Sequence, residues 1–253
     1  MLVVEPKAVV SAFVVQPFAT QLFKTHQRVR FTANIKDLNT FSAGQQVKAV
    51  ILQNNRWDLA QRDIVPAFVR GNVLDFNMEN TAVFPGGKEW RWLDLRSFRL
   101  FSDRVDHGTY NQDKRDFYLK KDVSRTEQRY AYFPDYNGMY NIVTYESINP
   151  LFQADYANVH FYYEPTDVLS LYKKKLYLQG QFTDYAINDR WEMVYNPESG
   201  LYECEALLKQ GYYNYTYTTV GDKGVDVENE LEGNYWETEN SYTVLIYYKS
   251  FTD

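Results

Sequence analysis

The chain has a single cysteine, Cys204, among its 253 residues. An internal disulfide needs two cysteines and a multi-cysteine zinc site needs more, so both kinds of site are excluded. Cys204 lies between Glu203 and Glu205, and neighbouring carboxylates raise the pKa of a thiol rather than lower it. The pattern therefore predicts a buried strand cysteine and no reactive thiolate.

Histidine is also scarce, and the chain has no net positive charge. The three histidines, His26, His107 and His160, lie far apart in the sequence and form no His-x-x-x-His pattern, so we expect ordinary surface or core histidines. The formal net charge of -6 provides no overall positive field that would attract the phosphates of nucleic acid. The sequence therefore predicts no metal, no other cofactor and no nucleic-acid partner.

No apolar run approaches the ~20 residues that a membrane-spanning helix needs, so we expect no membrane insertion. The opening residues, Met1 to Pro6, are too short for a signal peptide. Because export signals are removed from mature proteins, this opening leaves the cellular compartment undecided.

Motifs of catalysis and of calcium binding are incomplete. The tract 103–107 places an acid, a cation and a histidine together, but no Gly-x-Ser-x-Gly elbow or catalytic cysteine motif accompanies it, and we interpret it as a polar loop. Residues 75–79 resemble the start of a calcium loop, yet Asn80 and Gly86 stand where an EF-hand needs Gly and Glu. The sequence therefore predicts that the protein is not an enzyme.

Aromatic residues are abundant, at 17% of the chain with 23 tyrosines, and this composition favours strands over helices. Period-two alternation of apolar and polar residues supports the same conclusion, most clearly at 28–35. The strands expected in the first part of the chain are 9–15, 28–35, 47–53, two that flank the loop 84–87, 117–121, and a hairpin of 129–133 with 140–145 across 134–138.

Six more short strands are expected in the second part of the chain, at 158–163, 175–179, 191–195, 201–208, 212–219 and 242–249. The turn-rich residues 196–200 predict one antiparallel hairpin over 191–208. In the strand 212–219 the alternation predicts that Tyr213, Tyr215 and Tyr217 face inward.

The strand pattern is interrupted at 147–155, which we interpret as a domain boundary near residue 152. The predicted fold is all-β, with two β-sandwich domains of immunoglobulin-like or early-set-like type in tandem, at 1–152 and 153–253. A long acidic segment, 221–240, is expected to be an exposed connection. Its acidic residues offer at most loose calcium binding, and these residues are Asp222, Asp226, Glu228, Glu230, Glu232, Glu237 and Glu239.

Four stretches together resemble the plug protein family of Bacteroidetes type IX secretion, over its C-terminal two-thirds. They are VILQNNRWD at 50–58, VFPGGKEWRWLDLRSF at 83–98, LLKQGYYNYTY at 207–217 and LEGNYWETENSY at 231–242. Their order matches that of the family over nearly the whole chain. The resemblance implies a non-enzymatic, periplasmic and outer-membrane-associated protein, which binds the large outer-membrane translocon barrel and closes its periplasmic end between export events.

Members of that family normally carry a signal peptide and an additional N-terminal domain, so the resemblance also implies that this chain lacks both. If the missing domain contributes to docking, we expect the chain to bind its partner more weakly than the full-length protein does.

The second module also resembles the early-set sandwiches of glycogen-binding domains, through LYLQGQFTDY at 176–185 and LKQGYY at 208–213. Those proteins usually place a tryptophan where this chain has Tyr185, and Trp191 is the nearest substitute. The alternative function is therefore a carbohydrate-binding module with Tyr185 and Trp191 as ligand-binding candidates and weak glycan binding. Core packing is the competing role for most of the rings, Trp90 and Trp92 among them.

Overall fold

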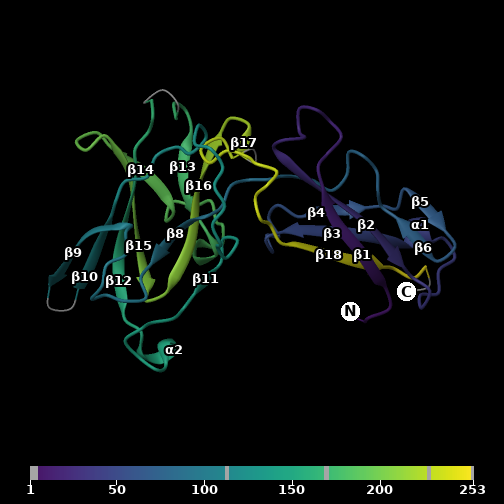
Figure 1. Cartoon of the computed structure of the whole chain (residues 1–253), viewed down its shortest axis with the longest axis horizontal. Helices are drawn as coiled ribbons and strands as arrows, with labels where there is room; N and C mark the ends of the chain where they lie inside the picture. The colour runs from purple at the N-terminus through teal and green to yellow at the C-terminus, as the bar shows by residue number, and fades with distance from the viewer. Residues whose placement is uncertain (1–4, 112–113, 168–170, 227–228, 252–253) are drawn as a thin grey trace. The chain divides into compact units, whose positions relative to one another are not determined.

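The computed structural model describes residues 5–111, 114–167, 171–226 and 229–251. Most of its regular elements are strands, and the helices α1 (Ala43–Gln46) and α2 (Pro150–Gln153) have four residues each. Within these ranges no helix has the length and apolar character needed to cross a bilayer. The predicted all-β class is confirmed, and the chain divides into unit 1, Met1–Gly87 with Asn234–Asp253, and unit 2, Lys88–Gly233 (Figure 1).

Unit 1 contains two antiparallel sheets. A five-stranded sheet has the order β1-β2-β6-β5, with β7 also paired to β2, and a three-stranded sheet has the order β18-β3-β4. Their bounds are β1 Val9–Val15, β2 His26–Asn34, β3 Val47–Gln53, β4 Gln61–Ile64, β5 Phe68–Arg70, β6 Val73–Asp75, β7 Val83–Pro85 and β18 Tyr242–Tyr248. The alternation of β2 places Val29, Phe31 and Ala33 in the core that both sheets share.

The division into units differs from the predicted domains 1–152 and 153–253. Strand β18, near the end of the chain, pairs with β3 along its whole length, from Tyr242 opposite Gln53 to Tyr248 opposite Val47. The predicted boundary near residue 152 falls inside unit 2, where the interruption at 147–155 corresponds to the short helix α2 and its flanking loops. A break in local alternation marks a loop, and it carries no information about which distant strands pair.

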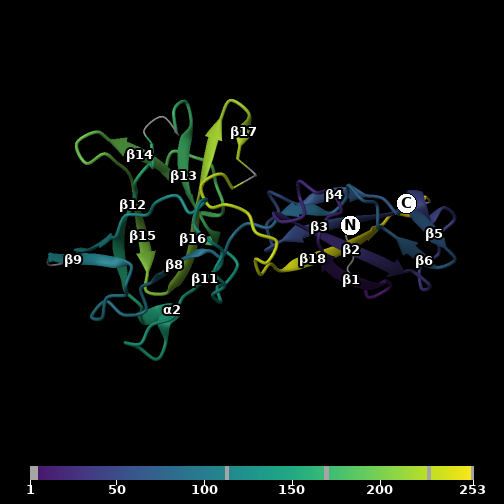
Figure 2. The same cartoon turned by 45° about the horizontal axis from the view of Figure 1, so that its top comes forward.

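Unit 2 is built on one sheet of ten hydrogen-bonded strands. The order is β11-β16-β13-β14-β15-β12-β10-β9, and β8 and β17 also pair with β16. Their bounds are β8 Arg91–Asp94, β9 Val105–Asn111, β10 Lys114–Leu119, β11 Tyr140–Asn141, β12 Tyr156–Tyr163, β13 Lys175–Gln179, β14 Glu192–Asn196, β15 Leu201–Lys209, β16 Tyr212–Gly221 and β17 Gly224–Val225, with a 3₁₀ turn at Gln181–Thr183. Strand β16 near one end of this order and strands β10 and β9 at the other contribute to one core, so the sheet folds over itself like a sandwich (Figures 1 and 2).

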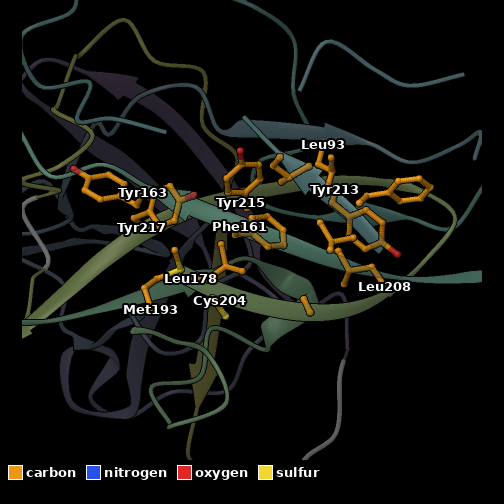
Figure 3. Packing of buried hydrophobic residues seen from close by; sticks show 14 of the residues in the cluster. Leu93, Phe161, Tyr163, Leu178, Met193, Cys204, Leu208, Tyr213, Tyr215 and Tyr217 are labelled. Carbon is orange, nitrogen blue, oxygen red and sulfur yellow. The ribbon is translucent and has the colours of Figure 1, made fainter. Parts of the chain in front are cut away.

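The core of unit 2 is rich in aromatic rings. Tyr213, Tyr215 and Tyr217 of β16 all face inward, as the alternation predicts. The ring of Tyr215 packs edge-on against Phe161 with centroids 5.2 Å apart (Figure 3). Tyr163 meets Tyr217 in the same way at 5.0 Å. The predicted hairpin over 191–208 is also confirmed, because β14 pairs with β15 across the turn.

The predicted hairpin of 129–133 with 140–145 is wrong. Residues 129–133 form no strand, and only Tyr140–Asn141 pair, with β16. The loop 134–138 instead lies over the outward face of β16, because the side-chain oxygen of Asn214 accepts the backbone N–H of Tyr136 at 2.5 Å. Polar groups on neighbouring strands therefore hold a segment that the local pattern assigned to a turn.

The acidic segment 221–240 differs from the predicted exposed connection. It contributes Leu231, Glu232 and Thr238 as buried residues. Burial of the Glu232 carboxylate is tolerated because Arg91 and Arg125 pair with it. Glu228 lies outside the described residues.

Candidate functional site

The two predicted ligand-binding rings lie in different environments. Trp191 is a core residue, 6% exposed, and its ring packs edge-on against Phe182 at 5.9 Å. Tyr185 is half-buried on the surface, where its ring meets that of Trp90 at 6.2 Å. The structure therefore does not bring Tyr185 and Trp191 together in one binding surface, and Trp191 is unavailable to a ligand.

Tyr185 instead belongs to a group of five rings on the outward side of β8 and β16, which we call the aromatic face. Its members are Trp90, Trp92, Tyr136, Tyr185 and Tyr212. Trp92 and Tyr212 stack with an interplanar angle of 5° and centroids 6.3 Å apart, and Tyr136 meets Tyr212 edge-on at 5.3 Å. Tyr136 is the most open of the five, at 45% exposed.

The register of β8 on β16 creates this face. Trp92 lies opposite Asn214, and Asp94 lies opposite Tyr212, so these four side chains share the outward side. Arg91 and Leu93 alternate with them and point inward. Sequence reasoning assigned most of these rings to the core because large rings efficiently fill the inner face of a sandwich.

The loop 134–138 fixes the rings at one end of the aromatic face. The Asp135 carboxylate accepts the backbone N–H of Trp90 at 2.5 Å. Gly138 has φ +85°, and a Cβ there would lie 2.7 Å from the Trp90 ring and 2.9 Å from the Tyr185 hydroxyl. Glycine at 138 therefore permits the close approach of the loop backbone to both rings.

Arg96 closes the other end of the aromatic face. Its guanidinium makes a two-point ion pair with Asp94, at 2.9 and 2.5 Å, and lies 4.7 Å from the ring centroid of Tyr145 and 5.6 Å from that of Tyr212. Burial, together with Asp94, raises the pKa of Tyr212 to about 12, so its hydroxyl stays neutral at physiological pH. The face presents neutral rings, one shielded ion pair and hydrogen-bond donors, which suits the binding of a partner or ligand.

A buried ion-pair network lies on the opposite, inward side of β8. Arg91 pairs with Asp122 at 2.7 Å and with Glu232 at 2.9 Å, and both carboxylate side chains are 4% exposed. Arg104 also pairs with Asp122, and Arg125 pairs with Glu232 at 2.6 Å. Sequence reasoning placed Arg104 in a polar surface loop, and nothing in the local sequence identifies this network.

The polar groups of the network are paired with one another. The hydroxyls of Tyr215 and Tyr217 donate to the second oxygen of Asp122 at 2.7 and 2.8 Å, so both of its oxygens are occupied. Burial disfavours charge on Arg91, but Glu232 and Asp122 outweigh burial and raise its pKa. Burial also raises the pKa of both tyrosines. The arrangement is a structural one, which locks β8 to β16 and to the loop that carries Asp122.

Acidification should destabilise unit 2 through Glu232. Burial alone raises a carboxyl pKa, but Arg91 and Arg125 outweigh burial and lower that of Glu232 from 4.5 to about 2. Because the pKa is lower in the folded state, the stabilisation is complete above the ordinary pKa and is lost as the pH falls towards 2, at a cost on the order of 3 kcal/mol. Urea midpoints at pH 7, 5 and 3 should approach those of Glu232→Gln as the pH falls, and parallel pH profiles of the two proteins would contradict this assignment.

The histidines and the tract 103–107 form no catalytic or metal-binding group. His107 and His160 stack on opposite faces of Tyr118, with ring centroids 4.5 and 4.4 Å away. His26 is buried in unit 1 beside Thr25. Within the part of the chain that the structure describes, no three His, Cys, Asp or Glu side chains are arranged to hold a metal ion.

Cys204 should be almost unreactive in the folded protein. It is buried in β15, and burial, reinforced by Glu205, raises its thiol pKa to about 11. At pH 8 this lowers the thiolate fraction roughly a hundredfold relative to an ordinary cysteine. Ellman's reagent should therefore label the native protein at least about a hundredfold more slowly than the guanidinium-unfolded protein, and rapid labelling of the native state would show that Cys204 is accessible.

Comparisons with known proteins identify a solved structure that is similar to this chain. No protein-family model matches the chain, and no curated protein matches it significantly. The crystal structure of a hypothetical protein from Parabacteroides merdae ATCC 43184, at 2.30 Å resolution, is similar over 99% of this chain, with a TM-score of 0.90 and 28% sequence identity. The similar region spans 62% of that protein, which comes from a bacterium of the Bacteroidetes. The two proteins share one fold.

Proposed function

We propose that this protein is a non-enzymatic component of type IX secretion, which binds the large outer-membrane translocon barrel from the periplasm and closes its periplasmic end. The observation that carries the proposal is the 28% identity over 99% of the chain to a protein of the Bacteroidetes, the phylum whose plug family the four sequence stretches resemble. A plug needs a rigid surface that fills an opening, and it must dissociate when cargo competes for that opening. This role needs no catalytic chemistry.

The positions of the four stretches support this proposal. Residues 83–98 and 207–217 meet where β8 pairs with β16, and they supply three of the five rings of the aromatic face. Residues 231–242 meet 83–98 through the ion pair of Glu232 with Arg91, and meet 50–58 through a backbone hydrogen bond from Asn54 to Ser241. The resemblance therefore coincides with parts of the chain that contact one another within each unit.

The aromatic face is the surface of unit 2 that we expect to contact the translocon. Tyrosine, tryptophan and arginine are the residues that most often dominate the binding energy of protein interfaces. Here Trp92, Tyr212 and Arg96 are held in place by stacking and by the ion pair with Asp94, so little side-chain freedom is lost on binding.

Affinity purification tests the proposal. The protein, tagged in its native host, is purified from gently solubilised outer membranes, and co-purifying proteins are identified by mass spectrometry. We expect recovery of the translocon, and an at least tenfold lower yield for the double variant Trp92→Ala, Tyr212→Ala than for the control Tyr195→Ala on β14. Absence of the translocon from a well-folded, abundant preparation would remove the main support for the plug function.

Carbohydrate binding is the second candidate, favoured by the half-exposed rings of the aromatic face, which include the predicted candidate Tyr185. Stacked rings such as Trp92 and Tyr212 provide a flat apolar platform that suits the faces of sugars. Affinity electrophoresis in polysaccharide gels distinguishes the two candidates. Glycan binding would be favoured if polysaccharide slows the migration of the unmodified protein and if Tyr185→Ala and Trp92→Ala abolish this effect. Migration of the unmodified protein that polysaccharide does not change would exclude glycan binding.

A further inference from the structure

Two strands of unit 1, β1 and β18, are terminal in their sheets. Among the described residues, β1 pairs only with β2 and β18 pairs only with β3. Val10 of β1 packs against the same core as Val244 and Ile246 of β18. We call the unpaired sides of these two strands the open edge.

The open edge lacks the features that normally protect a terminal strand. Natural edge strands carry lysine, proline or a bulge that discourages further pairing. The sequences VVSAFVV of β1 and YTVLIYY of β18 contain no charged residue and no proline, and β1 pairs with β2 in continuous register. Val9 and Phe13 of β1 are 66% and 53% exposed. A long, regular and apolar strand is therefore presented to solvent.

The hydrogen bonds of β2 reveal which backbone groups of β1 are free. On the side away from β1, Val29 donates its N–H to Ala82, and Phe31 accepts the N–H of Phe76. The backbone N–H and C=O groups of successive strand residues point to alternate sides, so the even-numbered residues of β2 point towards β1. Their partners in β1 are Val9, Ser11, Phe13 and Val15.

The remaining residues of β1, Val10, Ala12 and Val14, therefore direct their N–H and C=O groups away from β2. Among the described residues no backbone hydrogen bond satisfies these groups. The side chains of Ala12 and Val14 lie opposite Phe31 and Val29 on the core-facing side of the sheet, yet both are exposed. The five-stranded sheet is wider here than the three-stranded sheet that faces it, so its inner surface is incompletely covered.

The outward side of the same strands carries the guanidinium of Arg30. The Arg30 guanidinium lies 5.4 Å from the ring centroid of Phe13, and its Nε is buried without a hydrogen-bond acceptor. Within the described residues Arg30 has no ion-pair partner. A carboxylate brought to this face beside Phe13 would complement the charge of Arg30.

We propose that the free edge of β1 binds an extended segment of another polypeptide as an additional β-strand. The segment carries apolar residues at alternate positions on its core-facing side and a carboxylate on its outward side, opposite Phe13 and Arg30. Backbone hydrogen bonds to Val10, Ala12 and Val14 supply the pairing, as in other cases of strand addition. This inference goes beyond the proposed function and holds whichever protein donates the strand.

Edge-to-edge pairing of two copies of the chain explains the open edge less well. Seven residues of β1 span about 24 Å. A strip of that length and roughly 10 Å wide buries about 240 Å² on each partner, against about 800 Å² for a stable interface. A flexible segment, by contrast, can cover the exposed inner side chains and reach Arg30 on the outer face with its own side chains.

A synthetic peptide tests the proposal directly. The probe is a fluorescent nine-residue peptide with valine at alternate positions and one central glutamate among threonines on the other face, titrated to about 1 mM. We expect saturable binding by fluorescence anisotropy. In hydrogen exchange, the amides of Val10, Ala12 and Val14 should slow at least tenfold on binding, while that of Phe13, already paired with β2, should change little.

Matched variants separate strand addition from other modes of binding. Ala12→Pro removes one outward N–H without disturbing the ladder to β2, and should weaken binding at least tenfold, whereas Ala12→Thr retains the N–H and should bind normally. Arg30→Gln should bind the glutamate peptide and its glutamine analogue equally. No binding, binding unaffected by Ala12→Pro, or a dimer of the free protein that Ala12→Pro dissociates would each overturn the proposal, the last assigning the edge to a second copy.

Discussion

A chain that ends after Gly233 should lose the folded structure of unit 1 and retain that of unit 2. The missing residues contain β18, which pairs with β3 at seven positions. Strand β18 is one of the three strands of the smaller sheet. Tyr242, Val244 and Ile246 also pack on the core of unit 1. Loss of these partly buried side chains costs roughly 1 to 2 kcal/mol each, and uncovering β3 adds to this, so the sum is comparable to the whole stability of a small domain.

Hydrogen exchange measured residue by residue tests this truncation. Amides of β2 and β3 should lose protection, while those of β15 and β16 should keep it. The control is a chain that joins residues 1–87 to 234–253 through a short linker, which should fold because Gly87 and Asn234 are already adjacent, with the Gly87 N–H donating to the Asn234 side chain at 2.8 Å. Protected β2 and β3 amides in the truncated chain would show that β18 is dispensable.

The sequence predicts individual strands well because their evidence is local. Alternation in β2 and β16 identifies both the strands and their inward faces, and the turn at 196–200 identifies the hairpin of β14 and β15. The all-β class follows from these elements and from the aromatic composition. Each of these features depends on residues within about ten positions of one another.

The arrangement of the strands depends on contacts between distant residues, and the sequence predicts it poorly. The pairing of β18 with β3 joins residues about 190 positions apart, and no local pattern distinguishes β18 from a strand of unit 2. The proposed boundary near residue 152 assumed that neighbours in sequence share a domain. A discontinuous unit breaks that assumption.

The candidate site shows the same limit. The sequence indicated more aromatic rings than a core requires. Whether a given ring lies in the core or on the surface depends on how its strand pairs with its neighbours. Tyr185 and Trp191 both precede β14, yet Trp191 packs inside on Phe182 and Tyr185 packs outside on Trp90. Arg91 shows the reverse case, a charged residue that is buried because Asp122 and Glu232, from two distant segments, meet it there.

Asp122→Asn should destabilise unit 2 by about 3 to 5 kcal/mol, the cost of breaking a buried ion pair on one side. The substitution preserves shape but removes the charge that two arginines and two tyrosine hydroxyls share. The amide nitrogen cannot accept their hydrogen bonds, so a donor such as Arg91, 7% exposed at its side chain, is left without its carboxylate. The matched control is Asp155→Asn. Asp155 also pairs with an arginine, Arg115 at 2.6 Å, but the Asp155 side chain is 59% exposed. Loss of such an exposed ion pair costs at most about 1 kcal/mol. Urea unfolding measured by the near-ultraviolet signal of the buried tyrosines should separate the two variants clearly. Equal stability of the two would mean that water or a rearranged side chain compensates inside the core, and the network would then contribute specificity of pairing rather than stability.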